Sequence, residues 1–594
     1  MMKNSSVPIL SLTSLLVAGA FLCSAASGQT CDLTFQSQVE NMPGFGPSPV
    51  SDTELAVGEE RVLACSNSWF TLYDKSGNVV DEAEIGNHPS PTASNPFFLT
   101  NTVHTQSQIG DPVVYYDYHS ERFWIVAVEG RFFQIVPESD HFYPVYSHFH
   151  IAVSTSSTPV FDTDSWMRFD FEVYENKVNG TYNPTGPFSL PNTQSPCIVS
   201  HNELIAVDQH SLYITSFEEL FFDPTSNANR HRTGVVYVFD KATLLANSLP
   251  TPQVFKPFNT TTHDTWGEVA AVEYGFWNNT HPAYTVVTGL PPQSFMTSQQ
   301  DTIVIGALTR NPSTGVYTYD MFDLTGGGLP TWHNAPDPIA TPSGNNMNLI
   351  ASRFLHATYV ANSNGQGGRI YCTHHIANPS DSTRSIVRWY EIETRGWPYS
   401  TTTPNTPILV QYGDIADTGS EGLSYFDPAI AVDAYRTIGL TWTQCGDGTG
   451  EWPDFWMGSR KPSDTAGTIP FRSLRQAHTA SLMQGGTNKW DYSGCEPDPE
   501  VPCRFWGHSP LVLDSDQWQS YVSRVCVPCE PPSSESLSQP ADYNCDGMSD
   551  TLDALIFADL ISKGSKAADL NGSGTIDAGD LTEFEARMAK GQKN

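Results

Sequence analysis

The sequence predicts an all-β protein, a β-propeller of about seven blades, that ends in a small helical domain. Two observations predict the propeller. Strand-like runs of aromatic and β-branched residues fill the chain from about residue 31 to 525, and a short hairpin unit recurs among them. The composition agrees, because 44 Gly and 43 Pro supply many turns and only 16% of the residues are charged. The helical domain is predicted by a change of pattern after residue 541.

The first 28 residues have the features of an export signal. Lys3 precedes an apolar run from Val7 to Cys23, and Ala26-Ser27-Gly28 forms a small-x-small cleavage pattern. We expect cleavage near Gly28 and a secreted, extracellular or cell-surface protein, with a lipoprotein anchored at Cys23 as the weaker alternative. No later stretch approaches 18 apolar residues, so we expect no membrane span.

The charge balance bears on the kinds of partner. The formal net charge is -34 and the isoelectric point is about 4.6. Such an acidic surface argues against nucleic acid or an anionic membrane held by a basic patch. It favours solubility and divalent cations.

Cysteine usage fits an oxidising compartment. Of the 11 cysteines, Cys23 leaves with the signal and an even number remains, so we expect disulfides. Cys495 with Cys503 is a plausible local pair. Cys526 and Cys529 form a C-x-x-C motif without a second such motif, which favours structural disulfides over a redox or zinc site.

The recurring unit is clearest at two places in the segment 31–525. Asp111 to Asp117 reads DPVVYYD, and Asp427 to Asp433 reads DPAIAVD. Each begins a strand that ends in Asp, and a tight turn then leads into an aromatic strand. Looser relatives begin at Ser195 and Ser509. Asp at a turn can accept hydrogen bonds from the backbone amides that follow it.

Repetition of a hairpin at this scale predicts a propeller, in which radial closure protects the sheet edges. Candidate inner hairpins begin near residues 60, 112, 197, 268, 354, 424 and 508, and the units near 268 and 354 rest on strand composition alone. Seven blades are predicted and six are the alternative. A pair of β-sandwiches or a β-helix fits less well.

Several phrases of this region also resemble a known group of proteins. The segments AVGEERVLACSNSWFTLYDKSGNVV, GDPVVYYDYHSERFWIVAV, VRWYEIE and FWGHSPLVLDSDQW are similar to parts of large secreted bacterial propeller proteins that are loosely called sialidase-like. The resemblance implies a propeller fold and export from the cell. It implies no reaction.

Residues 526–541 form a Pro- and Ser-rich linker, and residues 542–594 follow as a separate domain. Two twelve-residue loops there match the EF-type calcium template, with Gly547 and Gly574 at the sharp turn. We expect two Ca²⁺ sites, the second weaker because Ser replaces a carboxylate. The predicted ligands are Asp542, Asn544, Asp546, Met548 through its carbonyl, Asp550 and Asp553, and then Asp569, Asn571, Ser573, Thr575 through its carbonyl, Asp577 and Asp580.

A helix is predicted after each loop but not before the first. Leu552, Leu555, Ile556 and Leu560 share one apolar face, as do Leu581, Phe584 and Met588. Two successive copies of a loop followed by a helix resemble a dockerin over about residues 542–589. That resemblance implies calcium-dependent folding and docking onto a cohesin-like or cell-surface protein. Cohesins recognise dockerins at positions 10 and 11 of the loops. Here these positions depart from the common pattern, so the resemblance does not identify the partner.

Chemistry in the propeller is predicted at the mouth of the central channel. Asp111 and Asp427 are candidate acid and nucleophile or base for glycoside hydrolysis, although a turn or strand-start role is the commoner one for Asp before Pro. His508 and the pair His374-His375 are further channel candidates, and at most one of that pair faces a site.

Other signatures are weak or missing. His148 and His150 share a strand face, but a core or surface role is commoner than metal binding for such a pair. The sequence has no clean Asp-box, arginine triad, nucleophile elbow, P-loop or H-E-x-x-H motif. An enzyme is therefore permitted but not indicated.

Two functions remain. We favour a secreted, non-catalytic recognition platform that a calcium-dependent tail anchors to a scaffold or surface partner. The alternative is a carbohydrate-active hydrolase, sialidase- or glycosidase-like, that takes part in extracellular polysaccharide breakdown and is displayed through the same tail.

Overall fold

The fold was examined in a computed structural model of the 594-residue chain. The structure describes residues 32–41, 52–67, 69–86, 96–98, 108–134, 142–173, 175–178, 181–182, 197–221, 231–256, 269–270, 272–274, 282–288, 300–336, 339–340, 346–349, 352–361, 367–399, 405–416, 422–433, 435–477, 488–490, 492–499, 501, 503–514, 517–527, 554, 557–558, 561 and 576–591. The predicted export signal and most of the predicted calcium loops lie outside these ranges.

Seven antiparallel sheets follow one another along the chain, and we number them as blades 1 to 7. Blades 1 to 3 contain β2 (Glu54–Val57), β3 (Arg61–Cys65), β4 (Trp69–Asp74) and β5 (Val79–Glu84); β6 (Gln108–Asp117), β7 (Arg122–Gln134), β8 (Phe142–Ser154) and β9 (Trp166–Glu172); β12 (Cys197–Val207), β13 (Ser211–Phe221), β14 (His231–Asp240) and β15 (Gln253–Phe255). The short strands β10 (Glu175–Val178) and β11 (Thr181–Tyr182) extend blade 3 beside β12.

The remaining blades have the same plan. Blades 4 to 7 contain β16 (Val269–Ala270), β18 (Ala283–Thr288), β19 (Thr302–Arg310) and β20 (Tyr317–Thr325); β23 (His356–Ala361), β24 (Gly368–Asn378), β25 (Asp381–Glu393) and β26 (Ile408–Ile415); β27 (Leu423–Val432), β28 (Ile438–Gly446), β29 (Asp454–Arg460) and β30 (Phe471–Gln476); β32 (Gly494–Pro497), β33 (Arg504–Asp514), β34 (Gln517–Cys526) and β1 (Leu33–Asn41). Outside the plan, β17 (Val272–Tyr274) lies parallel to β23, and β21 (Ile339–Ala340), β22 (Asn346–Leu349) and β31 (Asn488–Trp490) form a small sheet.

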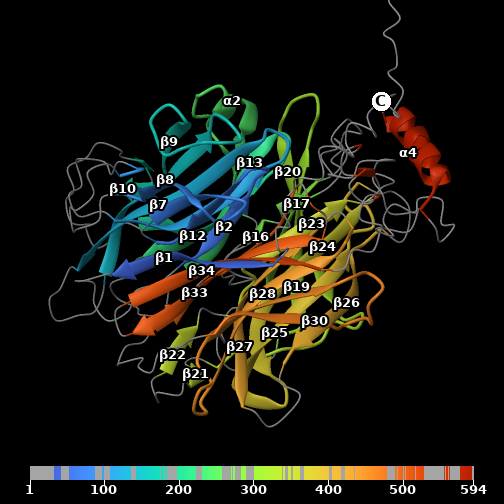
Figure 1. Ribbon diagram of the computed structural model, residues 1–594. Helices are drawn as coiled ribbons and strands as arrows, with labels where there is room; N and C mark the ends of the chain where they lie inside the picture. Colours follow the sequence, from blue (N-terminus) through green and yellow to red (C-terminus); the bar gives the residue numbers. More distant parts are fainter. Residues whose placement is uncertain are drawn as a thin grey trace, which may run out of the picture.

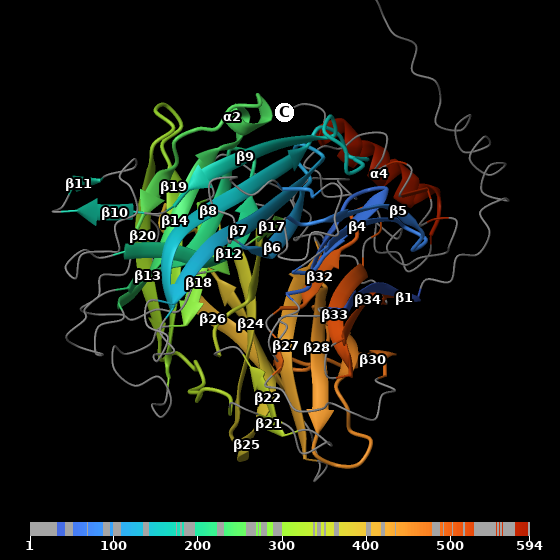
Figure 2. The same ribbon diagram turned by 90° about the vertical axis from the view of Figure 1, so that its left-hand side faces the viewer.

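The inner strands of the seven blades close into a ring. Neighbouring inner strands contact one another in the order β2, β6, β12, β16, β23, β27, β32 and back to β2. Figures 1 and 2 show the result, with blades 2 and 3 on one side of the molecule and blades 5 and 6 on the other. The protein is therefore a seven-bladed β-propeller, and the six-blade alternative is wrong.

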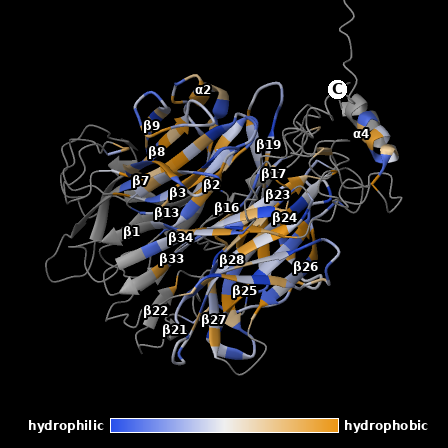
Figure 3. Cartoon of the chain, viewed as in Figure 1, coloured by the Kyte–Doolittle hydropathy of each residue, from blue (hydrophilic) through white to orange (hydrophobic). Residues whose placement is uncertain are grey.

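Hydrophobic side chains fill the space between the blades. In Figure 3 the strongly hydrophobic segments follow strands such as β7, β8, β23 and β27. One cluster joins Trp124 and Ile151 of blade 2 to Ile214 and Phe239 of blade 3. Burial of both faces of each sheet explains the low fraction of charged residues, because a sheet inside the ring has no polar face to expose.

The repeated hairpin unit is real, but its register differs from the prediction. Asp111 and Asp427 do not begin their strands; each lies within an inner strand, at a β-bulge that the strand pairing shows as a register shift. In blade 3 the shift falls between His201 and Leu204, so the unit there does not start at Ser195. In blade 7 the inner strand is β32, and the unit near residue 508 belongs to the second strand.

The Asp that ends the unit behaves as predicted. Asp117, Asp208 and Asp433 each accept hydrogen bonds from backbone amides of the following turn, for example from Ser211 N to Asp208 Oδ1 at 2.7 Å and from Thr437 N to Asp433 Oδ1 at 2.8 Å. These carboxylates are also buried, and each contacts the next blade or a residue that does. The unit therefore fixes the turn and joins blades.

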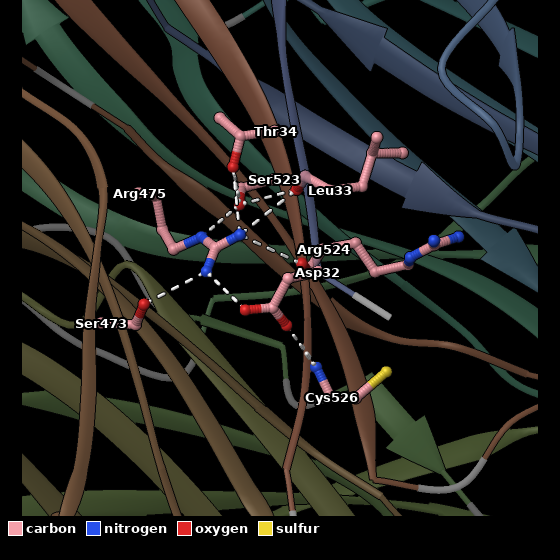
Figure 4. Close-up of polar contacts among 8 residues, drawn as sticks. All are labelled: Asp32, Leu33, Thr34, Ser473, Arg475, Ser523, Arg524 and Cys526. Atoms are coloured by element: carbon pink, nitrogen blue, oxygen red, sulfur yellow. Dashed lines mark hydrogen bonds and ion pairs between the residues drawn. The ribbon is translucent and has the colours of Figure 1, made fainter. Parts of the chain in front are cut away.

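The N-terminal strand β1 closes the ring by pairing with β34 as the outermost strand of blade 7. Figure 4 shows how Arg475 of blade 6 fastens this strand. Its Nε donates to Ser523 Oγ at 2.6 Å, and its two Nη atoms reach Asp32 Oδ2 at 3.2 Å and Thr34 Oγ1 at 3.1 Å. We call this contact the clasp.

The predicted pairing of Cys495 with Cys503 is wrong. Cys495 is a buried thiol outside any disulfide in β32, where it lies opposite Gly507, whereas Cys503 and Cys526 each take part in a disulfide. Cys65, Cys372 and Cys445 are also buried and are not in disulfides. Burial raises the pKa of the Cys495 thiol well above its usual value, since the thiolate would lose its hydration.

Helix is scarce in the described part of the chain. It includes α2 (Lys241–Leu245), which follows β14, and α4 (Ala578–Gly591) near the C-terminus. Among the described residues, no helix has the length and apolar character that crossing a membrane requires.

Candidate functional site

The inner-strand bulges at Asp111 and Asp427 have an equivalent just before β2 in blade 1. Asp52, Asp111 and Asp427 occupy the same place in blades 1, 2 and 6, six residues before Gly58, Asp117 and Asp433. All three have left-handed backbones, with φ of 35°, 48° and 46°. Such backbone strain in a residue other than glycine persists only where its surroundings hold it, and it is common at functional sites.

Hydrogen bonds hold the bulges in place. Asn67, in the turn after β3, donates to the Asp52 carboxylate, and its Oδ1 accepts the backbone amide of Asp111 at 2.7 Å. Ser493 of blade 7 donates to the carbonyl of Asp427 at 2.6 Å. The contacts of Asn67 with Asp111 and of Ser493 with Asp427 join neighbouring blades, and we call this ring of residues around the axis the rim.

Two contacts join blades that are not neighbours in the ring: blade 5 with blade 1, and blade 5 with blade 7. His356 of β23 places its Nε2 3.0 Å from Glu54 Oε1 of β2, an ion-pair distance without hydrogen-bond alignment. Arg353, just before β23, donates from Nη2 to the Tyr492 hydroxyl at 2.9 Å. Blades 5, 7 and 1 therefore meet at one place through polar side chains, which we call the axial cluster: Glu54, Arg353, His356 and Tyr492.

The axial cluster is largely shielded from water. Glu54, Arg353 and Tyr492 are each 4% exposed. Thr53 donates from its hydroxyl to the Tyr492 carbonyl at 3.1 Å, which fixes the tyrosine against blade 1. Ionisable groups buried at this depth cost stability unless they are paired.

The predicted pair Asp111 and Asp427 lies on this rim but in blades 2 and 6, which are not neighbours in the ring. Asp427 is 1% exposed, and its Oδ1 is 3.8 Å from Nδ1 of His375. Asp111 is half-buried and contacts Asn67. Asp427 therefore belongs to the densely polar part of the rim, and Asp111 to its more open part.

The predicted histidines separate into two groups. His375 faces Asp427, whereas His374 points to the other side of β24 and bonds the Tyr390 hydroxyl at 3.0 Å within an aromatic cluster. His148 and His150 pair with Asp170 and Glu129 on blade 2, as expected for core or surface residues. At most one member of the pair His374-His375 faces the rim, as predicted.

His508 is not at the start of an inner strand. It lies in β33, and its Nδ1–H donates to the carbonyl of Glu54 at 3.0 Å, so it supports the strand that carries Glu54. Burial lowers its pKa from about 6.5 to about 4, because the charged imidazolium would be desolvated.

This shift predicts a pH dependence of stability. The depressed pKa means that His508 stabilises the fold fully above pH 6.5 and that this contribution is lost as the pH falls toward 4. Asp433 acts in the opposite sense, since burial raises its pKa to about 6. We expect His508→Gln to gain stability relative to the unmodified protein as the pH falls from 6.5 toward 4, measured as the difference in urea midpoint between the two proteins at each pH. Parallel profiles for the two proteins would contradict the assignment.

Sequence reasoning missed the axial cluster. The segment Asp52-Thr53-Glu54-Leu55-Ala56-Val57-Gly58 is a copy of the hairpin unit in which Gly replaces the final Asp, and aligning it with DPVVYYD would have placed Asp52 on the rim. Arg353 and Tyr492 carry no comparable signal, because they precede their strands in segments without the repeat.

Of the predicted calcium ligands, only Asp577 and Asp580 lie in the described ranges. Asp580 is fully buried at the start of α4, where its Oδ2 accepts the amide of Asp577 at 2.8 Å. Phe584 of α4 is buried, as its predicted apolar face requires, and stacks on Phe557 with ring centroids 4.2 Å apart. Within the described ranges, no group of three or more His, Cys, Asp or Glu side chains is suited to a metal ion.

Comparisons with known proteins were made for the whole chain. No family model matches it, and no curated protein matches it. Solved structures that are similar include a protein of unknown function from Dyadobacter fermentans, with 9% identity, a TM-score of 0.32 and coverage of 71% of this chain and 96% of that one.

Two similar structures are named as glycosidases. An α-L-arabinofuranosidase from Fusarium graminearum has 10% identity, a TM-score of 0.33 and coverage of 74% of this chain and 99% of that one. A sialidase from Trypanosoma rangeli has 10% identity, a TM-score of 0.32 and coverage of 69% and 53%. The fold assignment rests on the strand order and the closed ring of this chain.

Proposed function

We propose that this chain is an exported carbohydrate-active protein whose propeller binds a saccharide at the axial cluster and hydrolyses a glycosidic bond. The observation that supports the proposal is the meeting of Glu54, His356, Arg353 and Tyr492 on the propeller axis. A structural core has no need of such a group, because apolar residues of similar volume would stabilise it at least as well.

The chemistry follows from the carboxylates. Glycoside hydrolysis uses one carboxyl group to protonate the leaving oxygen and a second to act as nucleophile or to activate water. We assign the first role to Glu54, whose imidazole neighbour His356 can exchange a proton with it, and the second to Asp427. Both are held by neighbouring blades, through His508 and Ser493, so their positions are fixed before a substrate arrives.

The test is a hydrolysis and binding assay on the full chain with a panel of oligosaccharides. We expect Glu54→Gln to lower the rate of hydrolysis about 100-fold, as is typical for loss of a general acid, while saccharide binding is retained. Asp447→Asn is the matched control, because it changes an exposed carboxylate of blade 6 outside the rim and should leave the rate nearly unchanged. Equal rates for Glu54→Gln and the unmodified protein would exclude the assigned role.

A non-catalytic recognition platform is the second candidate. The closeness of His356 Nε2 to Glu54 Oε1 favours it, since the imidazole occupies a carboxyl oxygen that a general acid would have to present to the leaving group. The same assay separates the two functions. Binding of a saccharide without release of products would establish the platform and exclude the hydrolase.

We also propose that residues 542–594 form a dockerin-like calcium module that anchors the protein to a scaffold or cell-surface partner. Phe557 and Phe584 support this proposal, because each stands four residues after the twelfth position of its loop and the two rings stack in parallel. Equivalent residues in contact are what two packed loop–helix repeats produce. In this proposal the protein acts outside the cell, as the export signal of residues 1–28 indicates.

Calorimetric titration of the full chain with Ca²⁺ tests the module. We expect two ions to bind, and Asp580→Ala to remove the second site, because this residue supplies the twelfth ligand of its loop. Asp447→Ala, which removes an exposed carboxylate of blade 6, is the control and should leave two sites. Binding of two ions by Asp580→Ala would disprove the ligand assignment.

A further inference from the structure

Arg353 differs from two other arginines of blade 5 in having no carboxylate partner among the described residues. Arg388 and Arg369 are each paired with a carboxylate, Asp414 and Glu391. Arg353 is 4% exposed, and no carboxylate of the described residues lies within 4.0 Å of its guanidinium nitrogens. Its polar contact is with the Tyr492 hydroxyl, and its Nε has no hydrogen-bond partner in the described part of the chain.

An unpaired guanidinium is costly at this depth. Removal from water penalises the charge, and no counterion among the described residues offsets the penalty. The net charge of the chain is -34, so the protein has many carboxylates, yet none in the described ranges is paired with this cation. A buried polar atom without a partner requires an explanation, and a group supplied by a ligand is the explanation that also accounts for the position on the axis.

We propose that Arg353 binds the carboxylate of an acidic saccharide, such as a chain of uronic acid residues. This inference rests on the proposed function, because it specifies the substrate class of the same site. The guanidinium presents N–H donors in a planar fork that fits the two oxygens of a carboxylate. Nη2 is engaged by Tyr492, so Nε and Nη1 are the donors that face the ligand.

Tyr492 is a positioning residue for this contact. Its ring lies 5.9 Å from the guanidinium carbon of Arg353, and its hydroxyl fixes one edge of the fork. Thr53 holds the backbone of Tyr492 against blade 1. The fork is therefore oriented before the ligand arrives, which lowers the entropy cost of binding.

The test measures binding of three probes to the full chain: a uronic acid oligosaccharide, its methyl ester and a sulfated neutral oligosaccharide. The buffer contains about 150 mM salt, where the Debye length of about 8 Å screens the acidic surface. We expect the uronate to bind about 10- to 100-fold more tightly than the ester. Arg353→Gln should abolish this preference, and Tyr492→Phe should reduce it. Arg384→Gln removes a cation from the outer part of blade 5 and is the control.

Thermal unfolding of the same variants separates a ligand contact from a structural one. Because the charge is unpaired, Arg353→Gln should unfold at the same temperature as the unmodified protein or higher, while it loses the uronate preference. If Arg353→Gln does not fold, Arg353 is structural and the inference is wrong. An unchanged uronate preference in Tyr492→Phe would also count against the inference, because the fork would then bind without its positioning residue.

The outcomes distinguish this inference from the proposed function. Equal binding of the uronate and its ester would overturn the inference and leave a neutral saccharide as substrate. Preference for the sulfated probe would overturn the assignment of a carboxylate as the group that Arg353 binds, and would identify a sulfate ester instead. Binding of none of the saccharides would overturn the proposed function together with the inference.

Discussion

Replacement of Lys241 by Met is expected to lower the free energy of unfolding by about 4 kcal/mol, a typical value for removal of one partner from a buried ion pair. Lys241, in α2 of blade 3, donates from Nζ to Asp117 Oδ2 of blade 2 at 2.7 Å, and also to the carbonyl of Asp208. Lys241 is 3% exposed and Asp117 is fully buried. Loss of the ammonium leaves the carboxylate without its counterion and breaks the link between two blades.

Urea unfolding measures this effect, with the double variant Lys241→Met/Asp117→Asn as its control. The double variant should be more stable than Lys241→Met alone, because the stranded charge is gone. A free energy of unfolding for Lys241→Met within about 1 kcal/mol of the unmodified protein, the usual range for exposed ion pairs, would show that water reaches Asp117 and that the pair does not hold the blades together.

Replacement of Arg475 by Ala is expected to lower the free energy of unfolding by about 3 kcal/mol, in the range for several hydrogen bonds to one charged group. The guanidinium bonds Ser523 and Thr34 and two backbone carbonyls, and its pair with Asp32 adds little because that carboxylate is half exposed. Its removal leaves β1 held by its pairing with β34.

Two comparisons decide whether the clasp acts through β1. Asp32→Asn should change the free energy of unfolding by a few tenths of a kcal/mol at most, since the pair is solvent-exposed. Hydrogen exchange should show faster exchange of the β1 amides in Arg475→Ala than in the unmodified protein. Uniform acceleration over all blades, with β1 no different from β24, would refute a local role.

The fold followed from the sequence because the repeated unit carries its own physical signal. The hairpin beginning at Asp111 combines a strand buried on both faces with a turn that its final Asp stabilises, and the same combination recurs at Asp427. Counting such units predicted seven blades. The register was harder, because Asp-Pro fits a strand start and a bulge equally well and only the cross-strand pairing separates the two.

The site followed only in part. The rim position of Asp427 could be predicted, since a repeat places equivalent residues at one level around an axis. The axial cluster could not, because the contact of His356 with Glu54 joins residues that are distant in the sequence, in blades 5 and 1. Which side chains cross a ring depends on its diameter and closure, and neither is encoded in a local pattern.

The pairing of β1 with β34 in blade 7 delays the last step of folding. Thr34 of β1 and its partner Ser523 of β34 are separated by 489 positions. At synthesis rates of roughly 5 to 20 residues per second, β1 waits on the order of 25 to 100 s for the strand it pairs with. Throughout that interval β1 has an unpaired edge, which a chaperone must cover or a neighbouring chain can join. The ring can therefore close only after the last blade has left the ribosome.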